Sequence, residues 1–221
     1  TSSETTIALR MFMYSIKEIF YSIQGEGYHS GRPSVFCRFA GCNLWSGREE
    51  DRERARCSFC DTDFVGTDGT EGGIYQDASM LVEKIVRYWP PSGGRGFVVC
   101  TGGEPLLQVD DALITALHDV GFEIAVETNG TVSAPSGIDW ICVSPKAGVE
   151  LLQTSGDELK LIYPQEGIDP EQYLTMNFRH FFLQPMDTVH HEAALKATLD
   201  YVLSHPAWRI SLQLHKRLNI R

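Results

Sequence analysis

The chain has 221 residues, enough for one sizeable domain with a hydrophobic core, and a formal net charge of −10. Hydrophobic residues make up 43% and charged residues 22%, an ordinary composition for a globular protein. The negative charge argues against direct nucleic-acid binding as the main function, and no apolar run is long enough to cross a bilayer.

The first ten residues are polar and lack the features of a secretory signal. We expect residues 1–11 to form a flexible N-terminal extension and residues 12–221 to form a single domain. Six cysteines in a chain without a signal favour a reducing cytoplasm over a disulfide framework. Three of them lie in apolar runs and should be buried as small hydrophobic side chains: Cys37, Cys100 and Cys142.

Strands and helices are predicted to alternate along most of the chain. Apolar runs bounded by turn residues predict strands at residues 34–39, 96–100, 122–127, 139–143, 158–163, 179–183 and 208–214. Apolar residues at helical spacing predict helices at residues 77–89, 110–120, 171–176 and 191–204. This alternation predicts a parallel sheet with helical crossovers.

A charged stretch at residues 43–56 separates the first predicted strand from the first predicted helix. Its four arginines are balanced by four acidic residues, which is typical of a short solvated helix or an ordered loop. We expect it to shield whatever the neighbouring cysteines bind, or to meet a partner protein.

Polar groups follow the predicted strands. They lie at Cys42 and at residues 101–105, 127–130, 144–146, 184–187 and 215–216. Ligands bind at the carboxyl ends of strands in barrels and open α/β sheets. The sequence therefore predicts one site that is built by many strands.

Cys42, Cys57 and Cys60 form a Cys-x14-Cys-x2-Cys arrangement. Three thiols suit either zinc or an iron–sulfur cluster, although both normally take four protein ligands. A cubane held by three thiolates leaves one iron open to a ligand that is not protein. A zinc site would need a distant fourth ligand, for example His29 or Cys37, and the spacing alone favours that interpretation.

The remaining motifs are weak signals in isolation. In residues 101–105 (Thr-Gly-Gly-Glu-Pro) the glycines allow close backbone approach to a ligand, and Glu104 can meet an ammonium group, but such turns are common. Residues 144–146 (Ser-Pro-Lys) are more often a turn with a solvated lysine. Residues 24–27 are consistent with a flexible loop, and Arg38 with an ordinary paired residue.

The joint order of these motifs resembles the 7-carboxy-7-deazaguanine synthase family of radical S-adenosylmethionine enzymes, from about Tyr14 to the last residue. The resemblance rests on residues 23–27, 36–44, 57–62, 101–105, 144–146, 184–187 and 215–220. Most radical S-adenosylmethionine enzymes space the cysteines as Cys-x3-Cys-x2-Cys, and the longer first gap is a variant found within this synthase family.

The resemblance implies a partial (β/α)6-type TIM barrel of roughly six strands. It implies ring contraction of 6-carboxy-5,6,7,8-tetrahydropterin to 7-carboxy-7-deazaguanine with loss of ammonia, a step of queuosine and deazapurine biosynthesis. The implied cofactors are a 4Fe–4S cluster, S-adenosylmethionine and Mg²⁺. The implied partners are a flavodoxin- or ferredoxin-type electron donor and a second copy in a homodimer, with no nucleic acid and no membrane.

The resemblance also assigns roles to individual residues. Cys42, Cys57 and Cys60 would hold the cluster, Thr62 would bind Mg²⁺, and no side chain is assigned as an acid or base. The implied cofactor-binding residues are Phe59, Cys60, Asp61, Gly103, Glu127, Asn129, Ser144, Pro145, Lys146, Gln184, Pro185, Met186 and Asp187. The implied substrate-binding residues are Ile23, Gln24, Gly25, Glu26, Thr101, His215, Arg221 and Arg38, the last as the counter-ion of the substrate carboxylate.

Two other classes of function remain open. A different radical S-adenosylmethionine enzyme, such as a glycyl-radical activase, would share the fold and the Gly-Gly-Glu-Pro turn. A non-catalytic zinc-binding module would use the same thiols. Residues 24–27, Arg38 and Thr62 favour a pterin pocket over both alternatives.

Overall fold

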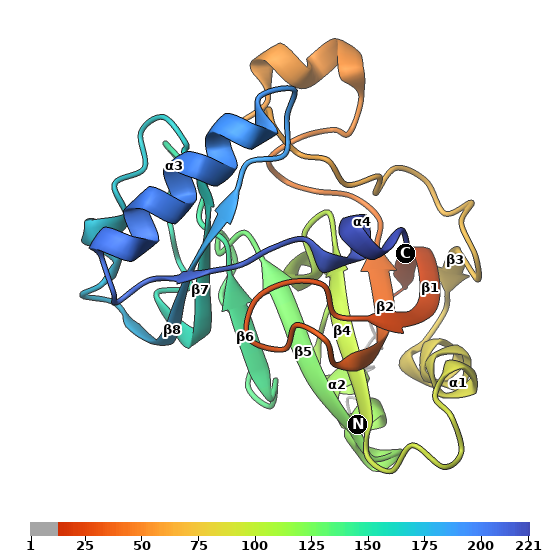
Figure 1. The fold of residues 1–221 in the computed structure, drawn as a ribbon. Coiled ribbons are helices and arrows are strands. Elements are labelled where there is room, and N and C mark those ends of the chain that lie inside the picture. Colours follow the sequence, from red (N-terminus) through yellow and green to blue (C-terminus); the bar gives the residue numbers. More distant parts are fainter. Residues whose placement is uncertain (1–12) are drawn as a thin grey trace, which may run out of the picture.

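The computed structural model describes residues 13–221, so the extension expected at residues 1–11 lies outside the described residues. Nine strands form one sheet in the order β3-β1-β2-β4-β5-β6-β7-β8-β9 (Figure 1). Their bounds are β1 (Tyr14–Ile23), β2 (Pro33–Phe39), β3 (Gly73–Tyr75), β4 (Gly96–Gly102), β5 (Phe122–Thr128), β6 (Trp140–Val143), β7 (Ser155–Tyr163), β8 (Asn177–Pro185) and β9 (Arg209–Ile210). The division into an extension and one domain stays a prediction.

From β2 to β9 every neighbouring pair of strands is parallel. Six of these strands have ordinary length, and β9 adds only two residues. Strand β1 lies between β2 and β3 and pairs antiparallel with both. Strand β3 therefore forms the edge of the sheet opposite β9. The arrangement is a partial barrel of the kind that the sequence predicted.

Helices complete the fold: α1 (Ala78–Tyr88), α2 (Asp111–Asp119), α3 (His191–Ser204) and α4 (Leu214–Leu218), with the 3-10 helices η1 (Glu49–Arg54), η2 (Pro105–Leu107) and η3 (Pro170–Tyr173). The predicted helical crossovers are found only in part. Within residues 13–221, the β5–β6 and β6–β7 connections contain no helix, and β7–β8 contains only η3.

The core forms where α1 and α2 pack on the outer face of β1, β2, β4 and β5. Leu81 and Leu113 are fully buried there, and burial of each such side chain contributes about 1.5–3 kcal/mol. Asp77 and Asp110 precede the two helices and cap them, because their carboxylates accept backbone N–H groups of the first turn. Helix α3 packs on β8 and β9 around a second apolar cluster (Figure 1).

Several elements differ from their predictions. The helix expected at 171–176 is found only as the 3-10 helix η3, and the strand expected at 208–214 is reduced to the two residues of β9, since residues 211–213 are irregular and Leu214 begins α4. The long strand β1 was not predicted, since Lys17 and Glu18 interrupt its apolar pattern. The ammonium of Lys17 is nevertheless accommodated, because it pairs with Asp63 at 2.9 Å and with Asp68 at 2.7 Å.

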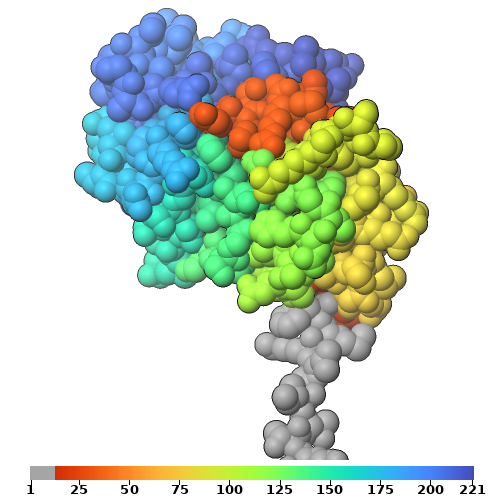
Figure 2. Space-filling view, turned by 90° about the horizontal axis from the view of Figure 1, so that it is seen from below, coloured from red at the N-terminus to blue at the C-terminus, as the bar shows by residue number. Residues whose placement is uncertain are grey.

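The early and late parts of the described chain lie side by side. The backbone N–H of Leu214 donates to the carbonyl of Gly25 at 3.0 Å, and the Ser22 hydroxyl donates to the carbonyl of Arg221 at 2.5 Å. Figure 2 shows the β1–β2 connection lodged against the C-terminal segment on the lower face of the molecule. None of the helices in the described part of the chain has the length and apolar character needed to cross a bilayer.

Candidate functional site

A cavity of about 380 Å³ lies at the carboxyl ends of the parallel strands. All of the residues that the sequence assigned to binding border it, with one exception. The exception is Pro145, which is buried and does not border the cavity. The structure therefore brings the predicted residues to one place, while their individual roles stay predictions.

The three spaced cysteines border the cavity from a segment that we call the cluster loop, residues 42–62. The Cys57 thiol hydrogen-bonds to Cys60, and this bond, with help from the backbone N–H of Thr62, lowers the pKa of Cys60 to about 6. The same bond and burial raise the pKa of Cys57. Burial also raises the pKa of Cys42, whose sulfur accepts the Leu44 N–H at 3.4 Å. A thiolate, the form that binds metal, is therefore favoured first at Cys60.

The donor set consists of three thiols, which fit an iron–sulfur cluster with one open iron, whereas a zinc ion would need a fourth ligand. Across residues 13–221, no group of three His, Cys, Asp or Glu side chains is arranged to hold a metal ion. Neither distant candidate for a fourth zinc ligand borders the cavity: Cys37 is in the core, and the His29 ring packs 4.3 Å from Trp140 between centroids.

The other three cysteines confirm their prediction. Cys37, Cys100 and Cys142 are buried in the sheet, and all six thiols are free. Burial raises the pKa of Cys100 to about 12, which keeps that thiol protonated and unreactive.

The Gly-Gly-Glu-Pro turn brings β4 against the start of the cluster loop. A Cβ added to Gly103 would lie 1.9 Å from the carbonyl oxygen of Gly41, so no larger residue fits there. Glu104, whose sequence context suggested an ammonium partner, has 0% exposure and does not border the cavity. Its carboxylate instead accepts the N–H of Leu106 at 3.0 Å, the Thr128 hydroxyl at 2.8 Å and the Asn129 N–H at 2.8 Å.

The ends of β6 and β8 supply a second group of predicted binding residues. Lys146 donates to the Ser144 hydroxyl at 2.8 Å, and burial lowers the pKa of its ammonium. Gln184 accepts the Ser211 hydroxyl at 2.9 Å. Lys216 pairs with Asp61 at 2.5 Å and also with Asp187 beyond the end of β8, which joins the cluster loop to this side of the cavity.

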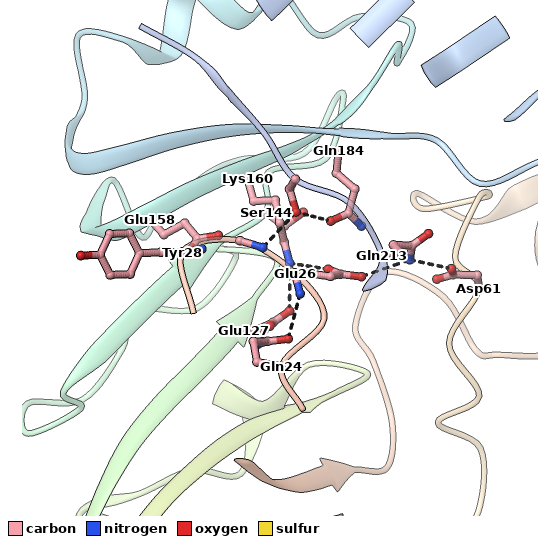
Figure 3. Close-up of polar contacts among 12 residues, drawn as sticks. Gln24, Glu26, Tyr28, Asp61, Glu127, Ser144, Glu158, Lys160, Gln184 and Gln213 are labelled. Atoms are coloured by element: carbon pink, nitrogen blue, oxygen red, sulfur yellow. Dashed lines mark hydrogen bonds and ion pairs between the residues drawn. The ribbon is translucent and has the colours of Figure 1, made fainter. Parts of the chain in front are cut away.

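A buried ion-pair group, which we call the carboxylate wall, consists of Glu26, Glu127 and Lys160 (Figure 3). The Lys160 ammonium lies 2.5 Å from Glu26 and 3.2 Å from Glu127. Gln24 donates to Glu127 at 2.7 Å, and Gln213 donates to Glu26 at 3.1 Å. Burial alone would raise the pKa of Glu26, but the Lys160 charge outweighs it and lowers that pKa to about 2.

Lys160 was missed by sequence reasoning. It stands between leucines in a buried parallel strand, Glu-Leu-Lys-Leu-Ile, and was read only as part of a predicted strand. A lysine in the middle of such a strand is itself the signal, because an ammonium is rarely buried without a carboxylate partner.

Arg38 and Arg221 border the cavity on the β1–β2 side. Arg38 donates to Glu18 at 3.0 Å, and Arg221 pairs with the same carboxylate. Glu18 therefore holds two guanidinium groups at this edge of the cavity.

The charged stretch predicted at residues 43–56 forms η1, which contains no buried residue and projects above the sheet in Figure 1. The Arg52 guanidinium reaches back and donates to the carbonyls of Ser58 at 2.8 Å and Cys60 at 3.0 Å. It also lies 4.1 Å above the ring of buried Trp45. The stretch is thus tied to the cysteines that it flanks.

Comparisons with known proteins add to this geometry. No model of a known protein family matches the chain. The chain is 61% identical to 7-carboxy-7-deazaguanine synthase of Bradyrhizobium diazoefficiens, with 94% of this chain and 99% of that protein covered. It is 44% identical to the enzyme of the same name from Bacteroides thetaiotaomicron, over 95% and 100% of the two chains. The fold matches the crystal structure of QueE from Escherichia coli with a TM-score of 0.68 and 26% identity, covering 91% and 94%.

Proposed function

Because the chain belongs to the 7-carboxy-7-deazaguanine synthase family, we propose that the cavity is the site of this reaction. The protein is a lyase of queuosine biosynthesis that contracts the ring of 6-carboxy-5,6,7,8-tetrahydropterin to give 7-carboxy-7-deazaguanine with loss of ammonia. It is a radical S-adenosylmethionine enzyme that acts on a small molecule.

We assign the cofactors to the side of the cavity formed by the cluster loop and the ends of β6 and β8. Cys42, Cys57 and Cys60 would hold a 4Fe–4S cluster, and its remaining iron would be open to S-adenosylmethionine. When bound, the two cofactors supply the radical that abstracts hydrogen from the substrate. The residues proposed to orient S-adenosylmethionine are Phe59, Cys60, Asp61, Gly103, Asn129, Ser144, Lys146, Gln184, Pro185, Met186 and Asp187.

We assign the pterin to the side formed by the β1–β2 hairpin, β4 and the C-terminal segment. Arg38 faces the substrate carboxylate, and Thr62 gives an oxygen to a Mg²⁺ ion shared with the substrate, as suits a hard cation with few protein ligands. The other residues proposed to contact the pterin are Ile23, Gln24, Gly25, Glu26, Thr101, His215 and Arg221.

The single observation that carries this assignment is the convergence of three thiols and both predicted sets of residues on one cavity. Its volume of about 380 Å³ is in the range of small-molecule sites, whereas an activase must admit a peptide segment. A zinc-binding module has no use for such a cavity.

Three further features are carried over from the family as proposals. A flavodoxin- or ferredoxin-type protein delivers the electron, the chain forms a homodimer, and the enzyme works in a reducing cytoplasm, a location that the free cysteines support.

The test is anaerobic turnover by reconstituted protein with S-adenosylmethionine, Mg²⁺, a reductant and the carboxytetrahydropterin, followed by mass spectrometry. We expect a product lighter by ammonia, with S-adenosylmethionine largely retained. Cleavage to 5′-deoxyadenosine without this product would move the protein to another class of radical enzyme. The absence of both reactions in protein shown to carry its cluster would overturn the proposal.

A further inference from the structure

Lys160 is the most deeply buried charge that borders the cavity, with 4% of its side chain exposed. It lies in the middle of β7 and reaches the cavity between two carboxylates that come from other elements. Glu26 belongs to the β1–β2 connection, and Glu127 lies near the end of β5. A buried ammonium is stable only with such partners, so Lys160 fixes where the two carboxylates lie.

The two carboxylates still have capacity for a ligand. Each has about four acceptor positions, and the protein donors described above use two on each group. Their side chains are 15% and 24% exposed and border the cavity. Because the Lys160 ammonium keeps Glu26 ionised, the Glu26 carboxylate offers acceptors only and selects a ligand with N–H donors.

The carboxylate wall is also held by residues on the proposed cofactor side of the cavity. Gln213 donates to Glu26 at 3.1 Å and lies 3.4 Å from Asp61 of the cluster loop. The N–H of Gly27 donates to Ser211, which donates to Gln184 on β8 (Figure 3). The Glu26 connection is therefore fixed relative to the cluster loop and to the end of β8.

We infer that Lys160 is a positioning residue for the substrate, holding Glu26 and Glu127 as a paired acceptor wall for the N–H groups of a 2-amino-4-oxopyrimidine ring. This inference rests on the proposed function and moves Glu127 from the cofactor side to the substrate side. Lys160 acts through the two carboxylates and does not touch the ligand.

The position of the wall agrees with the two ends of the substrate. Strands β4, β5 and β6 separate β7, which carries Lys160, from β2, which carries Arg38. A molecule with a carboxylate at one end and N–H donors at the other is thereby oriented in one direction, because each end meets the opposite kind of group.

The test uses reconstituted holoenzyme with the substitutions Lys160→Met and Glu127→Gln. We expect Lys160→Met to raise the KM for the pterin about tenfold or more, while the KM for S-adenosylmethionine changes by less than about twofold. More 5′-deoxyadenosine should be released per product, because a misplaced radical of the substrate or product takes hydrogen back from 5′-deoxyadenosine less often. Glu127→Gln, which keeps shape and removes one charge, should give a smaller rise in the pterin KM.

A matched control and a substrate analogue separate positioning from a structural effect. Lys84→Met removes a lysine that pairs with Glu71 at 2.7 Å outside the cavity, and should leave both KM values unchanged. An analogue with oxygen in place of the 2-amino group should be a poorer substrate for the wild type. In Glu127→Gln the difference in turnover between the pterin and this analogue should be smaller, because the amide of the new glutamine can donate to the oxygen of the analogue.

The outcomes are distinct. A wild-type holoenzyme that does not convert the pterin overturns the proposed function and this inference together. Turnover by the wild type with unchanged pterin KM in both variants overturns the role of Lys160 alone, as does an equal rise in both KM values. If circular dichroism shows that Lys160→Met is unfolded, Glu127→Gln and its analogue preference decide the question.

Discussion

The cluster loop and the carboxylate wall border the same cavity but are built in opposite ways. The carboxylate wall joins the β1–β2 connection to β5 and β7, and its charged groups are paired with one another. The cluster loop belongs to the long connection between β2 and β3, and its 3-10 helix buries no residue. One side is complete in the protein alone, and the other would be completed by the proposed cofactors.

This difference between the two regions indicates which side of the cavity has to be rigid before a ligand binds. Groups that must recognise a ligand gain from being fixed before binding, because less ordering is then required on association. The proposed cluster would add rigidity to its loop. Without it, the loop is anchored by the buried side chains of Leu44, Trp45 and Cys57 and by Arg52, which holds two of its carbonyls.

The strongest test of the cluster side is Cys60→Ala. This change removes the thiol that is most readily ionised, and we expect product formation to fall below detection together with the loss of bound iron and sulfide. Iron and acid-labile sulfide assays and the visible absorption spectrum measure this. Cys100→Ala, which removes a buried thiol outside the cavity, should keep the cluster; retention of full activity by Cys60→Ala would refute the assignment.

The largest effect on stability is expected at Glu104, which ties the end of β4 to the end of β5 beside both regions. Glu104→Ala leaves three buried donors without an acceptor, so the free energy of unfolding should fall by about 3 kcal/mol or more. Urea denaturation measures the change. Glu83→Ala, from an exposed pair with Arg87, should cost less than about 1 kcal/mol, and an equal loss in both variants would contradict the prediction.

We expect the carboxylate wall to make the free energy of unfolding depend on pH in the acid range. The pKa of Glu26 is lowered from 4.5 to about 2 in the folded protein, so its ion pair stabilises the fold fully above pH 4.5. That contribution is lost as the pH falls from 4.5 toward 2. The difference in unfolding free energy between the wild type and Glu26→Gln should therefore shrink between pH 7 and pH 3, as measured by denaturation at each pH. A difference that grows over this range would show that the wall is not ionised.

The smallest effect is expected at Arg52 on the cluster loop. Arg52→Lys keeps the charge but loses the planar fork that reaches two carbonyls, so stability should change by less than about 1 kcal/mol. The cluster should nevertheless bleach faster in air, followed by visible absorption. Arg54→Lys, at an exposed position of the same helix, serves as the control, and equal bleaching rates would remove the anchoring role of Arg52.

Much of the fold was predictable because its strands are continuous apolar runs. Helix α3 was predicted at its observed bounds, and the strands at 96–100 and 122–127 were found with two and one more residues at their ends. Strand β1 was not predictable from local pattern, because the partners of Lys17 lie more than forty positions away in the chain. A burial that depends on a distant partner leaves no local signal.

The same reason separates the two regions of the site. The cysteines and glycines of the cofactor side stand in short motifs, whose joint order along the chain carried the resemblance to the family. Lys160 is one residue in an apolar strand. Its role became visible only in the fold, which places Glu26 and Glu127 beside its ammonium. Glu127 was grouped with the cofactor residues for its position after a strand, whereas its hydrogen bonds run to Gln24 and Lys160.

The contact between Gly25 and Leu214 bears on how the enzyme folds. It joins an early and a late segment of the described chain, so the cavity has all of its sides only once residues 213–221 have docked on the β1–β2 connection. Contacts between residues far apart in the sequence form slowly, because closing a long loop costs entropy. We therefore expect this side of the cavity to be among the last parts of the fold to assemble.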